Sequence, residues 1–245
     1  MKYITKVLTK AYCRDQQPNC ITNWKKYISY EVNFEKVFHS FGTPLSNSME
    51  ERQWRKMIHR GTYIKHRDPR TDQKCRICKS ENETIIHLFR CHMVKPFWKQ
   101  CLQFCYKVLH AQIPTIIEAA IIFGEWKRDT LGPMPARAFM RHAFSHLYRH
   151  MCYVDLKKYT FVWERAYRDT VAAFQDACLR YARRLQLLHN RRKHTRLDSA
   201  PKDAYTRFEN FMTIDFPDGS ACFSDEFKTE ISRAHTLAQT RPNSH

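Results

Sequence analysis

The stretch from residue 136 to residue 200 contains neither glycine nor proline. Because those two residues most often interrupt helices, the stretch predicts long helices. Apolar side chains recur in it at steps of three and four residues, which is the repeat of one helix face. They are Met140, Ala143, Leu147, Met151 and Val154, followed by Tyr167, Val171, Phe174, Cys178, Tyr181, Leu185 and Leu188. We expect two long antiparallel helices with a break near residues 155–160, and the pattern also fits one unbroken helix.

The remainder of the chain also favours helices, so the expected fold class is all-α. Glycine supplies only 5 of the 245 residues, which argues against glycine-rich phosphate loops. Aromatic and branched residues at helical spacing predict short helices within residues 1–48. Ser48 is expected to cap the next helix, which carries Trp54 and Met57 on its apolar face and ends at Gly61.

Three cysteines and one histidine have the spacing of metal ligands. They follow the pattern C-x2-C-x8-H-x3-C, and they are Cys75, Cys78, His87 and Cys91. The first pair turns two thiolates toward one point, and the second pair places two more ligands on one face of a helix. A closed Cys3His set suits a structural Zn²⁺ and leaves no open position for catalysis. Two alternatives stay open: the four residues are unrelated, or His92 replaces His87.

The net charge of +18 is concentrated in two blocks of the chain. Residues 51–70 hold 7 basic and 2 acidic side chains, and residues 133–196 hold 14 and 4, whereas residues 197–245 hold 5 and 8. Because 43% of the chain is hydrophobic, the charge belongs to a folded protein and not to a disordered one. Two basic blocks on either side of a metal-type cluster favour nucleic acid, RNA and/or DNA, as the partner.

These features divide the chain into four segments and complete the expected fold: a helical domain stapled by a Cys3His zinc knuckle and followed by long antiparallel helices. The segments are an N-terminal helical segment (1–48), a zinc-knuckle segment with a basic linker (49–110), a long-helix basic region (111–196) and an acidic, flexible tail (197–245). No apolar stretch approaches the roughly 18 residues that cross a membrane, so no membrane partner is expected. Residues 1–20 lack an apolar leader, which predicts a protein of the nucleus and/or cytoplasm that is not secreted.

A longer pattern surrounds the metal motif. It comprises the helix of residues 54–61, the knuckle, the run from Glu83 to Cys91 and the pair Phe97-Trp98. This pattern resembles the zinc-binding segment that follows the polymerase in reverse transcriptases of LINE-type (non-LTR) retrotransposons. The resemblance covers about residues 51–100 and is closest between Glu83 and Cys91.

The resemblance implies that the four metal-type residues bind zinc. It also implies that the segment holds the element's RNA and its target DNA near the polymerase. The chain has no Tyr-x-Asp-Asp motif or equivalent pair of polymerase carboxylates, so no polymerase activity and no other enzymatic activity is expected. We therefore expect either a C-terminal remnant of such an element or a stand-alone derivative of it.

Two groups of residues are candidates for contacts with nucleic acid, through phosphates and through base stacking on aromatic rings. The first group is Trp54, Arg55, Lys56, Arg60, Tyr63, Lys65, Arg67 and Arg70. The second group is Arg180, Arg183, Arg184, Arg191, Arg192 and Lys193. For both groups the alternative is a solvated helix face without a ligand.

Two further patterns carry histidine and cysteine. His142, His146 and His150 repeat every four residues and so share a helix face. We interpret them as a polar or nucleic-acid-facing stripe rather than a metal site, because no carboxylate is interleaved with them. Cys101 and Cys105 are interpreted as core thiols.

Two other functions remain as alternatives to nucleic-acid binding. In the first, the chain is a zinc-stapled helical protein–protein module, and the apolar seam of residues 167–188 pairs with a partner helix or with a second copy. In the second, Pro217, Asp218, Glu226 and Lys228 form a metal-dependent nuclease site. The nuclease is the weaker alternative, because the segment is short and shows no convincing pair of strands.

Overall fold

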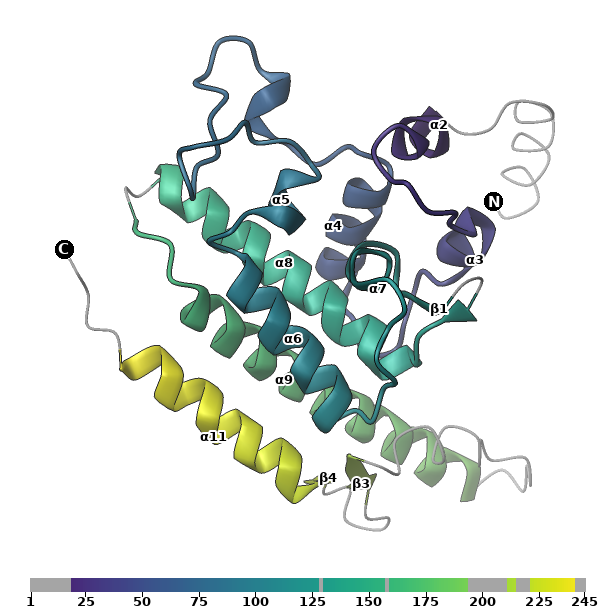
Figure 1. Ribbon diagram of the computed structural model, residues 1–245. Helices are drawn as coiled ribbons and strands as arrows, with labels where there is room; N and C mark the ends of the chain where they lie inside the picture. The colour runs from purple at the N-terminus through teal and green to yellow at the C-terminus, as the bar shows by residue number, and fades with distance from the viewer. Residues whose placement is uncertain (1–18, 128–129, 157–158, 194–210, 215–220, 241–245) are drawn as a thin grey trace.

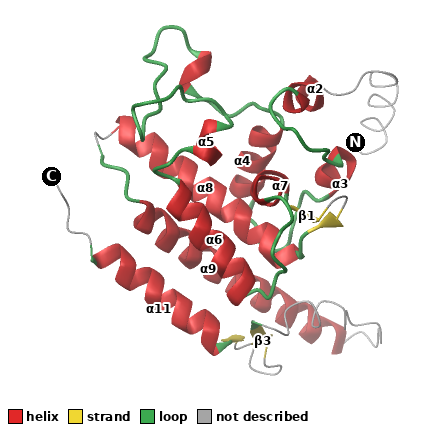
Figure 2. Cartoon of the chain, viewed as in Figure 1, coloured by secondary structure: helices red, strands yellow, loops and turns green. Residues whose placement is uncertain are grey.

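The computed structural model describes residues 19–127, 130–156, 159–193, 211–214 and 221–240, and of residues 189–193 it describes the backbone alone (Figure 1). These parts of the chain are mostly helical, with two small hairpins (Figure 2). The longer helices are α4 (Ser48–Ile58), α6 (Lys95–Lys107), α8 (Met134–Leu156), α9 (Trp163–Lys193) and α11 (Asp225–Gln239). The shorter ones are α2 (Asn19–Lys25), α3 (Phe34–His39), α5 (His87–Arg90), α7 (Ile117–Phe123) and the 3-10 turn η1 (Lys65–Arg67).

The helices α8 and α9 run antiparallel through the middle of the fold (Figure 1). The first ends at Leu156 and the second begins at Trp163, so the stretch without glycine and proline forms two helices and not one. Phe139 of α8 stands edge to face with Phe174 of α9, with ring centroids 5.3 Å apart. The predicted seam on α9 is buried here, with Phe174 and Cys178 at 0% exposure. From Tyr167 to Leu185 the seam therefore serves mainly the chain's own core, whereas Leu188 at its end is exposed.

The helix α11 lies along α9 and contradicts the prediction of a flexible tail for residues 221–240 (Figure 1). Phe227 is fully buried and packs against Phe104 of α6, with ring centroids 5.4 Å apart. The hydroxyl of Tyr167 on α9 donates to the Glu230 carboxylate at 2.6 Å. Phe227 and Ala234 lie on one apolar face of this helix. The acidic composition of the segment led to the prediction of a flexible tail instead of a helix. Residues 197–210, 215–220 and 241–245 of the predicted tail lie outside the described residues.

The helix α4 packs across α8, and both of its ends are capped. At the start, Asn47 and Glu50 form a capping box, so the cap lies one residue before the predicted Ser48. At the end, Arg60 adopts φ 57°, and the Gly61 N–H donates to the Lys56 carbonyl at 2.6 Å. This is the Schellman arrangement with arginine, not the predicted glycine, in the left-handed position.

Two antiparallel hairpins interrupt the expected all-α class. They are β1 (Glu125–Lys127) with β2 (Thr130–Leu131), and β3 (Met212–Ile214) with β4 (Ala221–Phe223). The second hairpin stands where no convincing pair of strands was expected.

One connected core holds these elements together. The buried hydrophobic residues form a single cluster that reaches from Cys20 in α2 to Ala234 in α11, so all four predicted segments contribute to one core. In the N-terminal part, Trp24 is fully buried and stands edge to face with Phe123 of α7 at 5.1 Å. Among the described helices, none is both long and apolar enough to span a membrane.

Candidate metal centre and nucleic-acid interface

The four residues of the metal motif converge on one point. One ligand atom from each of Cys75, Cys78, His87 and Cys91 lies within 4.8 Å of all the others. Cys78 Sγ lies 3.3 Å from His87 Nε2. His92, the alternative fourth ligand, is exposed and is not part of the cluster. Three sulfur atoms and one imidazole nitrogen in this arrangement can hold a metal ion.

A tight turn brings the first two cysteines together. The Lys79 N–H donates to the Cys75 carbonyl at 2.9 Å, and Lys79 adopts a left-handed φ of 59°. The Ile77 N–H points at Cys75 Sγ at 3.4 Å, as in a knuckle whose backbone donates to a ligating sulfur. The Cys75 N–H donates to the Glu81 carbonyl at 2.7 Å, which closes the loop behind the turn.

The other two ligands lie at the two ends of α5. The Thr84 hydroxyl accepts from the His87 N–H at 3.0 Å, and the Cys91 N–H donates to the His87 carbonyl at 2.7 Å. Their i, i+4 relation on a helical turn agrees with the prediction. Phe89 anchors this short helix, since its ring stacks on Trp98 of α6 at 5.7 Å and on Phe144 of α8 at 5.9 Å.

Contacts around the cluster favour protonation states in which its cysteines and histidine can bind a metal ion. The Glu81 carboxylate lies 3.3 Å from His87 Nδ1, which places the ring proton there and leaves the Nε2 lone pair facing the sulfurs. The Cys91 thiol donates to Cys75 and lowers the pKa of Cys75 to about 5. Burial raises the pKa of Cys78, but the Ser80 hydroxyl and backbone N–H groups outweigh burial and lower that pKa overall. Two of the three sulfurs thus favour the thiolate form that binds metals.

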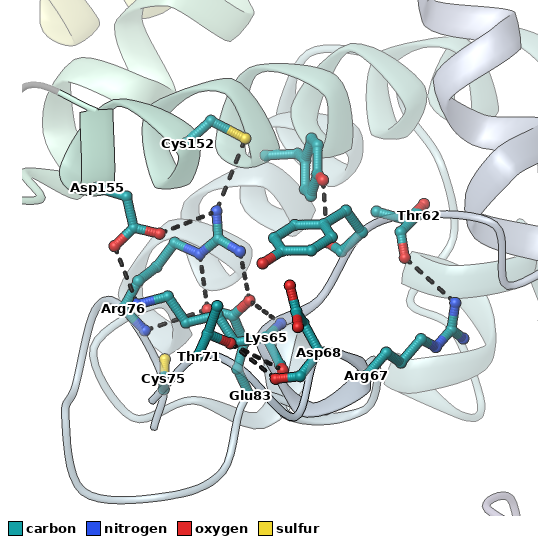
Figure 3. Close-up of polar contacts among 12 residues, drawn as sticks. Thr62, Lys65, Arg67, Asp68, Thr71, Cys75, Arg76, Glu83, Cys152 and Asp155 are labelled. Atoms are coloured by element: carbon teal, nitrogen blue, oxygen red, sulfur yellow. Dashed lines mark hydrogen bonds and ion pairs between the residues drawn. The ribbon is translucent and has the colours of Figure 1, made fainter. Parts of the chain in front are cut away.

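A buried network of ion pairs surrounds Arg76, the residue that follows Cys75 in the metal motif (Figure 3). The Arg76 guanidinium donates to both oxygens of Glu83, at 2.7 Å and 2.5 Å, and the two side chains are 3% and 0% exposed. Glu83 also accepts from the Lys65 N–H at 3.1 Å, which ties the basic linker to the knuckle. Asp155, near the end of α8, lies 3.6 Å from Arg76 and 3.1 Å from Lys65 Nζ.

Sequence reasoning assigned no role to Arg76 or Glu83. The available signal was the position of Glu83 at the start of the run that ends in Cys91. A carboxylate so close to a predicted metal ligand could have been paired with the arginine inside the C-x2-C turn. The network fixes the orientation of the knuckle relative to α8.

Trp54 corrects the prediction for the first basic group. Its side chain is 2% exposed and lies between α4 and α8, edge to face with Phe144 at 6.4 Å. A ring buried in this way cannot stack on a nucleobase. The prediction failed because the apolar face of α4, on which Trp54 lies, is the face that packs on α8.

Several other members of the first group already hold protein partners. Lys65 is half-buried in its ion pair with Asp155. The Arg60 guanidinium donates to the Asn23 carbonyl at 3.2 Å and lies over the Tyr27 ring at 4.5 Å. Partly exposed contacts also engage two linker arginines: Arg67 donates to the carbonyls of residues 60 and 62, and Arg70 pairs with the residue 68 carboxylate. These contacts hold the linker in one conformation.

The remaining members of the first group form an exposed basic face on α4. Arg55 and Lys56 are exposed and line a shallow depression together with Arg52 and His59. The Arg55 guanidinium lies over the Phe41 ring at 4.9 Å. Tyr63, 49% exposed, follows in the linker.

The second basic group lies elsewhere on the molecule. Arg180, Arg183 and Arg184 are exposed in the C-terminal half of α9, and Arg180 pairs with Asp176 one turn earlier. Figure 1 separates this end of α9 from α4, so the structure does not bring the two groups onto one surface. Arg191, Arg192 and Lys193 belong to the helical backbone of α9, but their side chains lie outside the described residues.

The histidine stripe on α8 was wrongly predicted to face solvent or nucleic acid. His142, His146 and His150 are 0%, 8% and 6% exposed, because this face of α8 packs between α4 and α9. Cys101 and Cys105 are core thiols, as predicted.

The proposed nuclease motif cannot be assembled from the described chain. Pro217 and Asp218 lie outside the described residues. Glu226 and Lys228 lie in the first turns of α11, where Lys228 pairs with Asp225 at 3.0 Å.

Comparisons with known proteins add no relative to this picture. No family model, no curated protein and no solved structure matches the chain. The function is therefore argued from the metal cluster and the surface beside it.

Proposed function

We propose that the protein is a zinc-binding protein that binds RNA and/or DNA through the exposed basic face of α4 and the adjoining linker. The observation that carries the proposal is the convergence of Cys75, Cys78, His87 and Cys91 within 4.8 Å. Three sulfurs and an imidazole suit Zn²⁺ among the common biological metals. All four positions of a tetrahedron are then filled by the protein, so the zinc has a structural role.

The metal and the basic face are connected through the linker. The knuckle carries Arg76 and Glu83, and Glu83 accepts the Lys65 N–H, while its carbonyl accepts the His66 N–H at 3.4 Å. A folded knuckle therefore fixes the linker that follows α4. Zinc in this role would hold the basic side chains in position for a phosphate backbone, whose contacts supply affinity without reading sequence.

The proposal extends to origin. The helix of residues 54–61, the knuckle and the Glu83–Cys91 run resemble the post-polymerase zinc segment of LINE-type reverse transcriptases. We propose that the chain is a derivative of such a segment that acts without the polymerase. The burial of Trp54 gives that position a packing role in this chain.

The direct test is the salt dependence of binding to single-stranded RNA and to DNA, measured by fluorescence anisotropy. Neutralising several phosphates gives a straight line of log K against log salt, with a slope of about −0.7 per contact for single strands. We expect a slope corresponding to several contacts and a loss of affinity after chelation of zinc. A flat salt dependence, or no binding at low salt, would reject the proposal.

One observation favours a second candidate, a protein–protein module. An apolar groove of about 630 Å³ lies between α6 and the loop before α7. Its lining includes Trp98, Leu102, Tyr106, Ile113, Ile117 and Trp126. Ile113 is 72% exposed and Ile117 is 56% exposed, which is unusual for neighbouring isoleucines. This candidate predicts a complex that survives high salt in light scattering, which the nucleic-acid proposal does not.

A further inference from the structure

Three buried residues outside the Cys3His cluster converge on a second point. Glu50 lies in the first turn of α4, and His142 and His146 lie one turn apart on the facing side of α8. One ligand atom from each lies within 4.8 Å of the other two. Their exposed fractions are 4%, 0% and 8%, so all three are removed from bulk water.

The hydrogen bonding of His142 fixes which of its nitrogens faces Glu50. Its Nε2 lies 2.7 Å from the Leu45 carbonyl, which only accepts, so Nε2 carries a proton. In the neutral ring, Nδ1 then presents a lone pair, and it lies 2.9 Å from Glu50 Oε1. Nδ1 has no hydrogen-bond partner among the described residues, and its contact with Glu50 is an ion pair only when the ring is protonated. With a neutral ring, two electron-rich atoms this close in the protein interior need a cation between or beside them, and either a proton on the ring or a metal ion can supply it.

His146 contributes a second unpartnered imidazole nitrogen. Its Nδ1 is buried and has no hydrogen-bond partner among the residues that the structure describes. An unpartnered imidazole nitrogen in a dry interior normally costs free energy, whereas a bound metal would satisfy it.

Outer contacts hold the three side chains as they do around known metal sites. Metal-bound histidines usually donate their other ring N–H to a carbonyl or carboxylate, as His142 does to Leu45. The Glu50 carboxylate accepts from the Asn47 backbone N–H and side-chain amide, both at 2.9 Å. The capping box of α4 therefore orients the carboxylate before any ion binds.

The distance between His142 Nδ1 and Glu50 Oε1 suits a shared ion. Ligand atoms about 2.0–2.1 Å from the same zinc lie about 2.9 Å apart at a right angle and about 3.3 Å apart at the tetrahedral angle. The 2.9 Å between His142 Nδ1 and Glu50 Oε1 falls at the short end of that range. One carboxylate and two neutral imidazoles are a ligand set that divalent first-row metals accept without sulfur.

We propose that Glu50, His142 and His146 form a second metal site, free of sulfur, that binds a divalent transition-metal ion such as Zn²⁺ and ties α4 to α8. Because the ligands are buried, the ion is structural. It would fix the helix that carries the basic face. The site does not depend on nucleic-acid binding.

The test is metal stoichiometry of the full chain, which is stripped of metal by a chelator, reloaded with Zn²⁺ or Co²⁺, desalted and measured by mass spectrometry. We expect two metals per chain in the wild type and one in Glu50→Gln. Glutamine retains the capping box, so Glu50→Gln preserves the start of α4. His146→Gln should also bind one metal. The matched control is His150→Gln, because His150 pairs with Asp169 at 2.9 Å outside the cluster and should leave two metals bound.

Cobalt distinguishes the two sites by their ligands. Thiolate ligands give Co²⁺ an intense charge-transfer absorption, which carboxylate and imidazole ligands lack. We expect Glu50→Gln to retain that absorption, which also reports that the variant is folded, and Cys78→Ser to lose or alter it while keeping the second cobalt. One metal per chain in the wild type, with no change in Glu50→Gln, would overturn the proposal. The cation beside Glu50 would then be a proton on the His142 ring.

Discussion

The guanidinium of Arg76 and the carboxylate of Glu83 face each other as a bidentate pair inside the knuckle, with Nε–Oε2 at 2.7 Å and Nη2–Oε1 at 2.5 Å. Arg76 stands between two metal-type cysteines, and Glu83 stands between the second cysteine and the histidine. The pair therefore joins the two legs of the metal loop. Through Asp155 it also joins that loop to α8.

Removing Arg76 should destabilise the fold strongly. Arg76→Ala leaves the fully buried Glu83 carboxylate without its charged partner, and such a loss costs about 3–5 kcal/mol. The measurement is the free energy of unfolding in urea with zinc present.

Arg90→Ala is the matched control, since Arg90 also forms a two-point contact with a glutamate, Glu118. The Arg90 side chain is 57% exposed, so its removal should cost no more than about 1 kcal/mol. Equal losses in the two variants would show that the network behind the knuckle has no special role.

Cys78 should be required for metal binding at the first site. Cys78→Ser is expected to lower the zinc content by one per chain and to lower the melting temperature, because the free energy of structural zinc binding stabilises the folded state. A chelator should then lower the melting temperature of the wild type more than that of the variant. Cys222→Ser is the control, since Cys222 is exposed on β4 and lies outside the metal cluster. A wild-type zinc content and melting temperature in Cys78→Ser would contradict the assignment of this site.

The Cys3His cluster could be predicted from sequence because the spacing of its residues is local. A C-x2-C turn and an i, i+4 pair each bring two side chains together by short-range backbone geometry, so only the contact between the two pairs depends on the tertiary fold. Long helices followed likewise from the absence of glycine and proline, which left open whether there was one helix or two. In both cases residues that are close in sequence determine the local structure.

The orientation of each helix around its axis was not accessible in the same way. Trp54 was predicted to stack on nucleobases and the three histidines of α8 to form a polar or nucleic-acid-facing stripe, yet both faces are buried in the same packing of α4 against α8. Arg141 illustrates why exposure is hard to predict from composition. It is 1% exposed, and its charge is neutralised by Glu51 of α4, 90 residues earlier. Charged and polar residues look exposed in a sequence until the partner that compensates them is known.

The face of α4 should contribute more to nucleic-acid binding than the C-terminal half of α9. Arg55→Gln with Lys56→Gln removes two exposed charges that form no ion pair within the described part of the chain, and should reduce the salt slope by about 1.4–1.8, the value of two phosphate contacts. Arg183→Gln with Arg184→Gln removes the same charge from α9 and should change the slope by less. The measurement is anisotropy at several salt concentrations, with circular dichroism as the check on folding. A larger effect of the α9 pair would move the interface to that helix.

The last helix should stabilise the whole fold. Phe227 is fully buried among Phe104, Phe174 and Phe223, with centroid distances of 5.4, 6.2 and 4.5 Å. Phe227→Ala should leave a cavity and cost about 3–5 kcal/mol in the free energy of unfolding. Lys228→Ala, one residue further along the exposed face of α11, should change it by no more than about 0.5 kcal/mol. The same urea midpoint in both variants would indicate that α11 is dispensable; a loss confined to Phe227→Ala would make it part of the core that positions α9 and, through α8, the metal centre.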